Sequence, residues 1–483
     1  MNTPLLIDGE LVAGSAGEFG TVNPATEEIL GTAADADAGD LDRAIAAARR
    51  AFDDTDWPRD TALRVGCLRQ LHTALTDEIE HLRAITVAEV GAPVSLTYGG
   101  QLQMPVDSLA YVADLAENYS WKSDLGEAAP FGRPTRRTQV REATGVVGAV
   151  TPWNFPHQLN LAKLGPALAA GNTVVLKAAP DTPWCAAELG RIIAERTDFP
   201  PGTVNIITAA DHGIGAQLTA DPRVDLVSFT GSTATGRAVM AAASATVKRV
   251  FLELGGKSAY IVLDDADLGA ACAAAAAGVA MHAGQGCAFT TRLLVPRDRY
   301  DEAVAAASAA MAGIGFGDPT DPATVCGPLI SARQRDRVQG YLRLALAEGG
   351  RFGCGGGRPA DRSSGFYIEP TVIGGLTNDA RVAREEIFGP VLVVLAHDGD
   401  ADAVRIANDS PYGLSGAVAG ADPDRVDRVA SRLRTGTINV NGGVWYSADV
   451  PFGGYKQSGV GREMGLVGFE EYLQTKVIAT GTG

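Results

Sequence analysis

Between Val146 and Leu254 the chain alternates short apolar runs with helix-like segments, and this alternation limits the possible folds more than any other feature. The runs are VVGAV, TVVLK, VNIIT, DLVSF and KRVFLEL. A parallel strand that is apolar along its whole length is buried on both faces, so the connecting helices must cover both sides of the sheet. The pattern therefore predicts a doubly wound α/β domain, which binds ligands beyond the carboxyl ends of its strands.

A second alternation of the same kind follows Cys287. TRLLVP, GPVLVVLA and TGTINVN are strand-like, and RYDEAVAAASAAM and DAVRIAND between them are helical. Because 483 residues are too many for one hydrophobic core, these segments predict a second α/β domain. The polar segment from Trp121 to Glu142 interrupts the first domain, and FEEYLQTKVIAT near the end is strand-like and charged. Both segments predict projecting β-structure.

Local signals organise the N-terminal region. LIDGELVAG alternates apolar and polar residues around Asp8-Gly9, a dipeptide preferred in tight hairpin turns. Asp40 is expected to cap the helical pattern LDRAIAAARRAF, and the helical periodicity of ALTDEIEHLRAITVAEV should end before Gly91 and Pro93. The region is therefore expected to start with a hairpin and to continue with helices.

Charge and cysteine content argue against several partners. The formal net charge of −16 disfavours binding to nucleic acid or to anionic lipid. The six cysteines contain no CxxC pair, and MNTPLLIDGE does not have the pattern of a secretory segment, so a cytoplasmic location is expected. The uncharged stretch from Leu268 to Thr291 is long enough to cross a membrane, but its alanine-rich composition favours a packed helix. We expect no nucleic-acid, membrane or metal-ion partner.

Polar residues stand at the ends of the predicted strands, where ligands of such a sheet bind. Lys177 is either a solvated lysine or a contact to ribose or phosphate. Glu253 is either a salt-bridge partner or a general base with a raised pKa. Gly231 and Ser232 mark a strand-to-helix junction, which is either an ordinary N-cap or a pyrophosphate site. Asn154, in the stiff turn TPWNFP, either satisfies the turn backbone or donates a hydrogen bond to an oxyanion.

The glycine-rich segments do not support a nucleoside triphosphatase. GSTATGRA has the glycine spacing of a phosphate loop, but Arg237 and Ala238 stand where Lys and Ser or Thr are required. FLELGGKS has the required ending, but Phe251 stands where the first glycine belongs. This class of enzyme is therefore disfavoured.

Cys287 lies between an alanine-dominated helical pattern and a strand-like run, in MHAGQGCAFTTRLLV. A cysteine there is by default a small buried core residue. The surrounding motifs indicate another use, because TPWNFP, VVLK, SFTGS, LELGGKS, GQGC, EEIFGP and PFGGYKQSG follow one another along the chain. In identity, order and spread they resemble the motifs of the NAD(P)-dependent aldehyde dehydrogenase superfamily.

The resemblance implies a role for each motif residue. Cys287 corresponds to the nucleophile, Asn154 and the Cys287 backbone N–H to the oxyanion hole, and Glu253 to the base that activates the hydrolytic water, with Lys163 in a proton relay near it. Relatives that transfer the acyl group to coenzyme A typically lack this glutamate, so its presence favours hydrolysis. The implied cofactor contacts are Lys177 at the adenosine ribose, Ser232 and Trp153 at the pyrophosphate, Glu386 at the nicotinamide ribose and Phe388 at the nicotinamide ring, with Gly231 and Gly255 also on the cofactor.

The implied reaction is the oxidation of an aldehyde to a carboxylic acid with NAD, through a thiohemiacetal and then a thioester on Cys287. NADP stays open as the cofactor, because Pro180 replaces a glutamate that chelates both ribose hydroxyls in many NAD-preferring relatives, and no replacement arginine is evident.

The substrate tunnel implied by the resemblance is apolar and fairly wide. Gly286 and Ala288 flank the nucleophile, and Ala162 stands where relatives often have a large aromatic residue. The expected walls of the tunnel are Phe155, Leu159, Trp445 and Tyr446. We therefore expect medium or bulky hydrophobic aldehydes to be preferred over acetaldehyde or charged semialdehydes.

These inferences divide the chain into three parts. A dinucleotide-binding domain is expected at residues 1–121 and 144–254, a catalytic domain at 255–455, and a small β oligomerisation element at 122–143 and 466–483. The element implies a homodimer or a homotetramer, and the sequence does not choose between them.

Two other classes of protein compete with the dehydrogenase. A cysteine hydrolase using Cys287 with His282 or Glu253 needs no dinucleotide, and it leaves the cofactor-type motifs without an explanation. A non-catalytic protein of the same fold would be expected to lack the nucleophile or the base. Cofactor binding discriminates between the first rival and the dehydrogenase.

Overall fold

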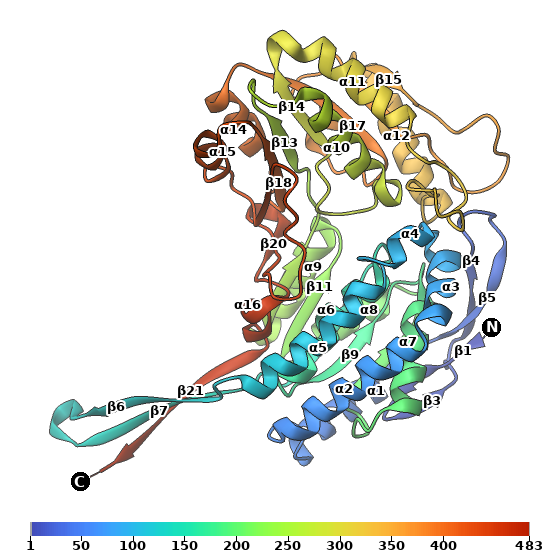
Figure 1. The fold of residues 1–483 in the computed structure, drawn as a ribbon. Coiled ribbons are helices and arrows are strands. Elements are labelled where there is room, and N and C mark those ends of the chain that lie inside the picture. Colours follow the sequence, from blue (N-terminus) through green and yellow to red (C-terminus); the bar gives the residue numbers. More distant parts are fainter. Residues whose placement is uncertain (1, 483) are drawn as a thin grey trace.

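The computed structural model describes residues 2–482 and contains two α/β units, with a narrow β arm that projects from the body (Figure 1). Each unit has a mostly parallel sheet between layers of helices. The predicted α/β class with parallel sheets is therefore confirmed.

The sheet of the first unit has eight strands in the order β20-β12-β11-β8-β9-β10-β2-β3. The five strands expected from the sequence form its parallel centre: β8 (Val146–Val150), β9 (Thr173–Lys177), β10 (Val204–Ile207), β11 (Leu226–Thr230) and β12 (Arg249–Glu253). Antiparallel edges are added by β20 (Gly459–Val460), β2 (Leu5–Ile7) and β3 (Glu10–Val12). The chain leaves β8 toward β9 in one direction and returns to β11 on the other side, so the loops after β8 and β11 meet where the strand order reverses, which is where such sheets bind ligands.

Helices cover both faces of this sheet, as the apolar strands require. One face packs against α1 (Ala38–Asp54), α8 (Gly213–Ala220) and α9 (Thr233–Ala243). The other packs against α2 (Thr61–Asp77), α5 (Gln103–Asn118), α6 (Pro156–Ala169) and α7 (Pro183–Arg196). The helices α3 (Ile79–Val90) and α4 (Val94–Thr97) and a small sheet of β1 (Asn2–Thr3), β5 (Ile29–Asp35) and β4 (Gly17–Val22) complete the unit.

The N-terminal signals are confirmed except for one cap. The β2–β3 hairpin turns at Asp8 and Gly9, and α3 ends at Gly91 with a φ of 67°. The residue that caps α1 is Asp37, so the expectation for Asp40 is wrong. Two aspartates three residues apart both fit the cap pattern, and Asp40 instead closes a capping box by accepting from the Asp37 backbone N–H at 3.1 Å.

The second unit has a seven-stranded sheet in the order β15-β16-β17-β14-β13-β18-β19, parallel except for β15. The three strands expected from the sequence are β14 (Arg292–Pro296), β17 (Val391–His397) and β19 (Thr437–Val440). The others are β13 (Ala259–Val262), β15 (Arg351–Cys354), β16 (Thr371–Gly374) and β18 (Ser415–Ala419). One face packs against α10 (Leu268–Ala280), α11 (Tyr300–Ala312) and α12 (Ala332–Ala347), and the other against α14 (Asp400–Asn408) and α15 (Pro423–Ala430), while α13 (Arg381–Arg384) is a single turn.

The arm is an antiparallel sheet of β6 (Lys122–Ala128), β7 (Thr135–Ala143) and β21 (Leu473–Gly481), with β7 in the middle. Residues 465–470 form α16 (Gly465–Glu470), so the strand of the C-terminal segment begins later than its sequence pattern suggests. None of the helices in residues 2–482 has the length and apolarity needed to span a membrane.

Candidate active site

A cavity of about 970 Å³ lies between the two units, and both contribute to its lining. Trp153 and Asn154 come from the loop after β8, and Gly231 and Ser232 from the loop after β11. The second unit contributes the segment that contains Cys287, together with Glu386, Phe388 and residues 442–446. The strand-order reversal of the first sheet and the predicted nucleophile thus share one cavity.

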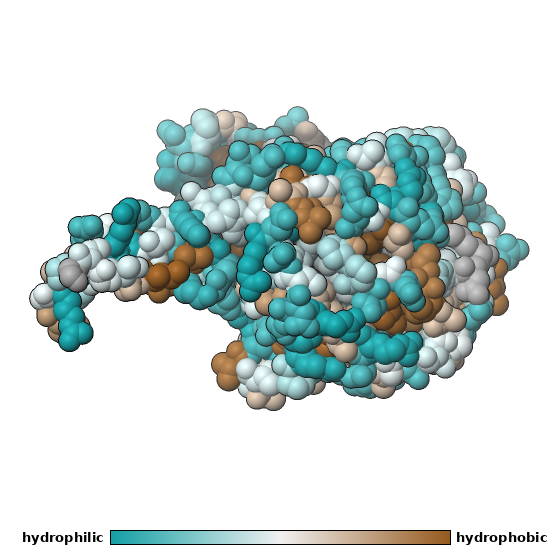
Figure 2. All heavy atoms as spheres, turned by 90° about the horizontal axis from the view of Figure 1, so that it is seen from below, coloured by the Kyte–Doolittle hydropathy of each residue, from teal (hydrophilic) through white to brown (hydrophobic). Residues whose placement is uncertain are grey.

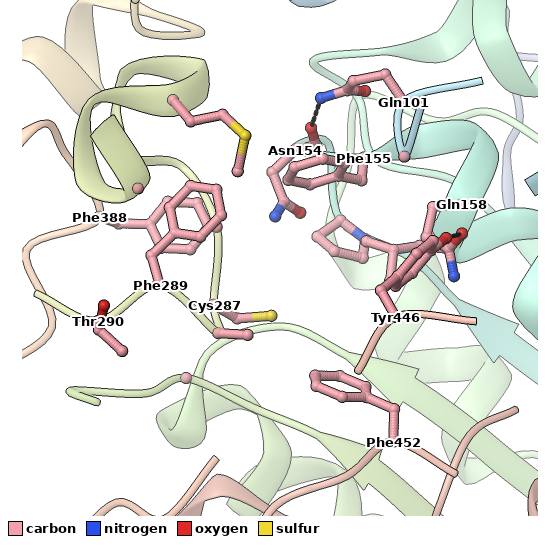
Figure 3. A pocket seen from close by; sticks show the side chains of 18 of the residues that line it. Gln101, Asn154, Phe155, Gln158, Cys287, Phe289, Thr290, Phe388, Tyr446 and Phe452 are labelled. Atoms are coloured by element: carbon pink, nitrogen blue, oxygen red, sulfur yellow. Dashed lines mark hydrogen bonds between the residues drawn. The ribbon is translucent and has the colours of Figure 1, made fainter. Parts of the chain in front are cut away.

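Cys287 follows α10 and a tight turn. Gly284 in this turn has a φ of 72°, and a Cβ there would collide with the backbone of Gly389. The Cys287 sulfur reaches the cavity from the turn (Figure 3). Burial raises the pKa of the Cys287 thiol, and the carboxylates of Glu386 and Glu253 raise it further. The resting thiol is therefore protonated at neutral pH.

Asn154 is held by three hydrogen bonds from distant segments. Its backbone carbonyl accepts from Gln101 Nε2 and from His282 Nε2, both at 2.9 Å. Its side-chain Nδ2 donates to the carbonyl of Gln285 at 2.9 Å. The Asn154 amide lies on the same cavity as the Cys287 sulfur (Figure 3), so a fixed N–H donor faces the region of the thiol.

Glu253 ends β12 behind the cavity wall and is not part of the cavity lining. The side chain is buried, and neither carboxylate oxygen has a hydrogen-bond partner among residues 2–482. A Cβ on Gly453 would lie 2.6 Å from Oε1, so only glycine leaves room for this carboxyl group. Burial and the neighbouring Glu463 raise the pKa of Glu253, while Lys163 and Arg462 lower it.

Lys163 and Glu463 form a buried ion pair next to Glu253. Lys163 Nζ lies 2.7 Å from Glu463 Oε1 and 3.0 Å from Ser228 Oγ. Glu463 also lines the cavity. The pair therefore connects the surroundings of Glu253 to the cavity, and Glu463 is a site residue that sequence reasoning missed, because it follows the last motif and carries no local signal.

Lys177 ends strand β9, and Ser232 lies between strand β11 and helix α9, as the sequence predicts. Lys177 is buried at the end of β9, outside the cavity lining, and Nζ donates to the carbonyl of Ala209 at 3.3 Å. Burial lowers the pKa of Lys177 to about 8. Ser232 caps α9 by accepting from the backbone N–H of Thr235 at 3.2 Å, and with Gly231 it also lines the cavity, so the cap and a ligand-binding helix terminus coincide.

Glu386 packs against the loop after β12. Its Oε1 accepts from the backbone N–H of Gly256 at 2.9 Å, and a Cβ on Gly255 would overlap its carboxylate. Phe388 has a φ of 60°, and its ring meets Trp153 edge to face with 5.4 Å between centroids. A helix N-terminus, a buried lysine and a carboxylate with adjacent aromatic rings fit a dinucleotide, whose pyrophosphate, ribose and base these groups would contact.

The substrate walls expected from the sequence are brought together with one exception. Phe155, Leu159, Trp445 and Tyr446 line the main cavity. Ala162 instead lines a separate cavity of about 30 Å³, which shares Gln158 and Met464 with the main one. The sequence reasoning also missed other lining residues: Gln158, Phe452, Met464, Gln334 and Arg337.

The fold and this cavity define a nucleotide-dependent oxidoreductase with a cysteine nucleophile. The aldehyde dehydrogenase family model matches residues 11–478, and the chain belongs to this family. The predicted family and enzyme class are therefore confirmed.

Relatives differ in the aldehyde that their names give. A 3-succinoylsemialdehyde-pyridine dehydrogenase of Pseudomonas sp is 42% identical, covering 98% of this chain and 97% of its own. A point mutant of betaine aldehyde dehydrogenase of Staphylococcus aureus, solved with NAD+, is 36% identical with a TM-score of 0.96, covering 100% of this chain and 96% of its own. A mutant of aldehyde dehydrogenase C of Pseudomonas syringae, solved with NAD+ and octanal, is 38% identical with a TM-score of 0.93, covering 99% and 96%. Both structural neighbours contain NAD+, which agrees with the expected cofactor.

Proposed function

We propose that this chain oxidises medium or bulky hydrophobic aldehydes to carboxylic acids with NAD+. The observation that carries the proposal is that Cys287 and Asn154 share one cavity with the dinucleotide-type groups at Ser232 and Glu386. A cysteine hydrolase would have no use for those groups, and His282, its candidate base, donates to a backbone carbonyl instead.

In the proposed first half-reaction the Cys287 thiol gives up its proton to the solvent, and the resulting thiolate adds to the aldehyde carbon and forms a thiohemiacetal. An aldehyde has no leaving group, so only addition followed by loss of hydride yields an acyl derivative. The Asn154 Nδ2 and the Cys287 backbone N–H stabilise the negative oxygen, and a donor of this kind typically contributes about 10²- to 10³-fold in rate. When bound, the nicotinamide supplies the hydride acceptor, positioned by Glu386 and Phe388.

In the second half-reaction water attacks the thioester on Cys287. Glu253 takes a proton from this water, and burial raises the pKa of Glu253, which makes its carboxylate a stronger base. Rotation of the Glu253 side chain past Gly453 would bring the carboxylate to the cavity, and the Lys163–Glu463 pair lies next to it as the proposed proton relay. The hydroxide adds to the acyl carbon and the C–S bond breaks. Glu253 returns its proton to the leaving sulfur, so the carboxylic acid leaves and the thiol is restored.

The proposed substrate class follows from the charges around the substrate side. Phe155, Leu159, Trp445 and Phe452 are apolar walls. Glu463 is paired with Lys163, so among the described residues no unpaired charge on this side favours a charged tail. A higher kcat/KM for a short charged aldehyde than for a hydrophobic one would refute this preference.

The cofactor is proposed to be NAD+, with NADP+ as the alternative. Pro180 offers no carboxylate to the ribose, but the neighbouring Asp181 acts on Lys177 electrostatically and lies 3.6 Å from Arg333. A carboxylate there would repel a 2′-phosphate. Production of NADH and NADPH across an aldehyde panel measures the preference.

Two variants test the proposed chemistry. Cys287→Ser should abolish aldehyde oxidation and leave dinucleotide affinity largely intact, and continued turnover would remove Cys287 from its role. Glu253→Gln should give one burst of reduced cofactor and then stall, because the thioester is no longer hydrolysed. Steady turnover by Glu253→Gln without a burst would assign the base to another residue.

The arm is proposed to join protomers into a homodimer or a homotetramer. β21 pairs with β7 on one side only, and Leu125, Val477 and Ile478 are exposed on the arm, which projects from the body in Figure 2. An exposed strand edge with apolar side chains favours pairing with another chain. Light scattering measures the oligomeric state, and a monomeric wild type would contradict the proposal.

All six cysteines are free, and we propose that the enzyme works in the reducing cytoplasm.

A further inference from the structure

Gln158 is a polar side chain on the apolar side of the cavity. It lies on α6 beside Leu159 and lines the main cavity. The Tyr446 hydroxyl donates a hydrogen bond to Gln158 Oε1, and Gln158 Nε2 lies 3.7 Å from Met464 Sδ. In Figure 3 Gln158 and Tyr446 lie together on the side of Cys287 opposite Phe388.

The partners of Gln158 determine which end of its amide is free. A tyrosine hydroxyl can donate or accept, but a thioether sulfur has no hydrogen, so the amino end of Gln158 must face Met464. The sulfur is a weak acceptor, and the amino group carries two hydrogens. Gln158 therefore retains hydrogen-bonding capacity in apolar surroundings, where an incompletely bonded amide costs free energy.

Gln158 lines the part of the cavity that lies across Cys287 from Phe388 (Figure 3). Gln158 and Met464 separate the main cavity from the small cavity that Ala162 lines. An aldehyde whose carbonyl carbon meets Cys287 would reach Gln158 with its tail.

Building on the proposed aldehyde oxidation, we infer that Gln158 is a specificity-determining residue that donates a hydrogen bond to an acceptor atom on the tail of an otherwise apolar aldehyde. The acceptor is a neutral lone pair, such as a ketone or ether oxygen. Tyr446 fixes the amide orientation by occupying Oε1, and Met464 leaves the amino group free to exchange its weak contact for a better one. A plain alkanal would leave this donor buried without a partner.

The test compares pairs of straight-chain aldehydes of equal length, in which an ether oxygen replaces a methylene group at each position in turn. For one position, wild-type kcat/KM should exceed that of the alkanal by roughly tenfold, the upper range for a neutral hydrogen bond. Gln158→Met keeps the length of the side chain and removes the donor, so the preference should vanish and kcat/KM for the alkanal should rise. Tyr446→Phe should reduce the preference by freeing the amide.

Gln70→Met is the matched control, because Gln70 lies on α2 and bonds the exposed Asp198. This control should keep the wild-type preference. Wild type that oxidises alkanals but favours no oxygen position would overturn the inference, as would Gln158→Met with the preference intact. If Gln158→Met does not fold, an unchanged preference in Tyr446→Phe would overturn it. Failure of the proposed function is distinct, because no aldehyde would then yield reduced cofactor.

Discussion

The two hydrogen bonds to the Asn154 carbonyl support a quantitative prediction about the oxyanion donor. Gln101→Met and His282→Phe each remove one of the two donors and keep a side chain of similar shape. The Phe ring would also keep the edge contact that His282 makes with Phe155, at 5.2 Å between centroids. The double variant leaves the carbonyl without either bond.

The expected losses follow from how a buried carbonyl responds. Each single variant leaves the Asn154 carbonyl with one hydrogen bond. The loss of transition-state stabilisation should therefore be about 0.5–1.5 kcal/mol, or about 2- to 10-fold in the rate of hydride transfer. In the double variant the buried carbonyl has no partner, which costs about 2 kcal/mol more, or roughly another 30-fold. The peptide can relieve this cost by rotating, and a displacement of about 1 Å in the donor is enough to slow the reaction strongly. Asn154→Ala removes the side-chain donor itself and therefore sets the upper limit of the rate loss, at about 10²- to 10³-fold.

Rapid mixing of enzyme, NAD+ and aldehyde measures reduced cofactor in the first turnover, before thioester hydrolysis contributes. Unfolding temperature and NAD+ affinity are the controls for general disruption of the fold. The predicted signature is a loss in the double variant that exceeds the product of the two single losses. A loss equal to that product, or variants that change only the unfolding temperature, would refute the idea that these bonds position Asn154.

Three further predictions test the buried charges and the cofactor side. Lys163→Met should lower the free energy of unfolding by about 3–5 kcal/mol, because it leaves Glu463 buried without its partner. Denaturant unfolding measures this loss, and adding Glu463→Leu should restore most of it. Gly255→Ala should weaken NAD+ binding in a fluorescence titration, because its Cβ would overlap the Glu386 carboxylate; unchanged affinity would contradict this. Burial lowers the pKa of Lys177 to about 8, so NAD+ affinity should fall as pH rises through about 8 and the ammonium loses its charge. Lys177→Arg should remove this pH dependence.

The sequence predicts best those residues whose position the parallel sheet determines. Apolar strands with helices between them require a doubly wound sheet, and its strand ends place Lys177, Ser232 and Glu253 along one edge. The pairing of Cys287 with Asn154 could not be predicted from the pattern alone, because local periodicity does not show which distant loops meet at one cavity. The resemblance to a family supplied that pairing.

The residues that the sequence did not reveal depend on contacts between side chains far apart in the chain. Glu463 is 300 positions from Lys163, and only the folded chain brings them within 2.7 Å. Ala162 was expected at the main cavity from its place in the motif, but it lines a separate small cavity, which shares Gln158 and Met464 with the main one. The sequence around an alanine does not show which of two neighbouring cavities its side chain will line.

The charges around Cys287 explain how one site can hold both a resting thiol and a base. Burial, and after it the carboxyl groups of Glu386, Glu253 and Glu463, raise the pKa of the Cys287 thiol, so the free enzyme keeps its sulfur protonated. Glu463 raises and Lys163 lowers the pKa of Glu253, and because these two opposing charges are paired, burial remains the main cause of its raised pKa. A carboxylate whose pKa is raised by burial binds a proton more readily, which is what removal of a proton from water requires. Burial of the Glu253 carboxyl group, rather than any one charged neighbour, therefore contributes most to its strength as a base.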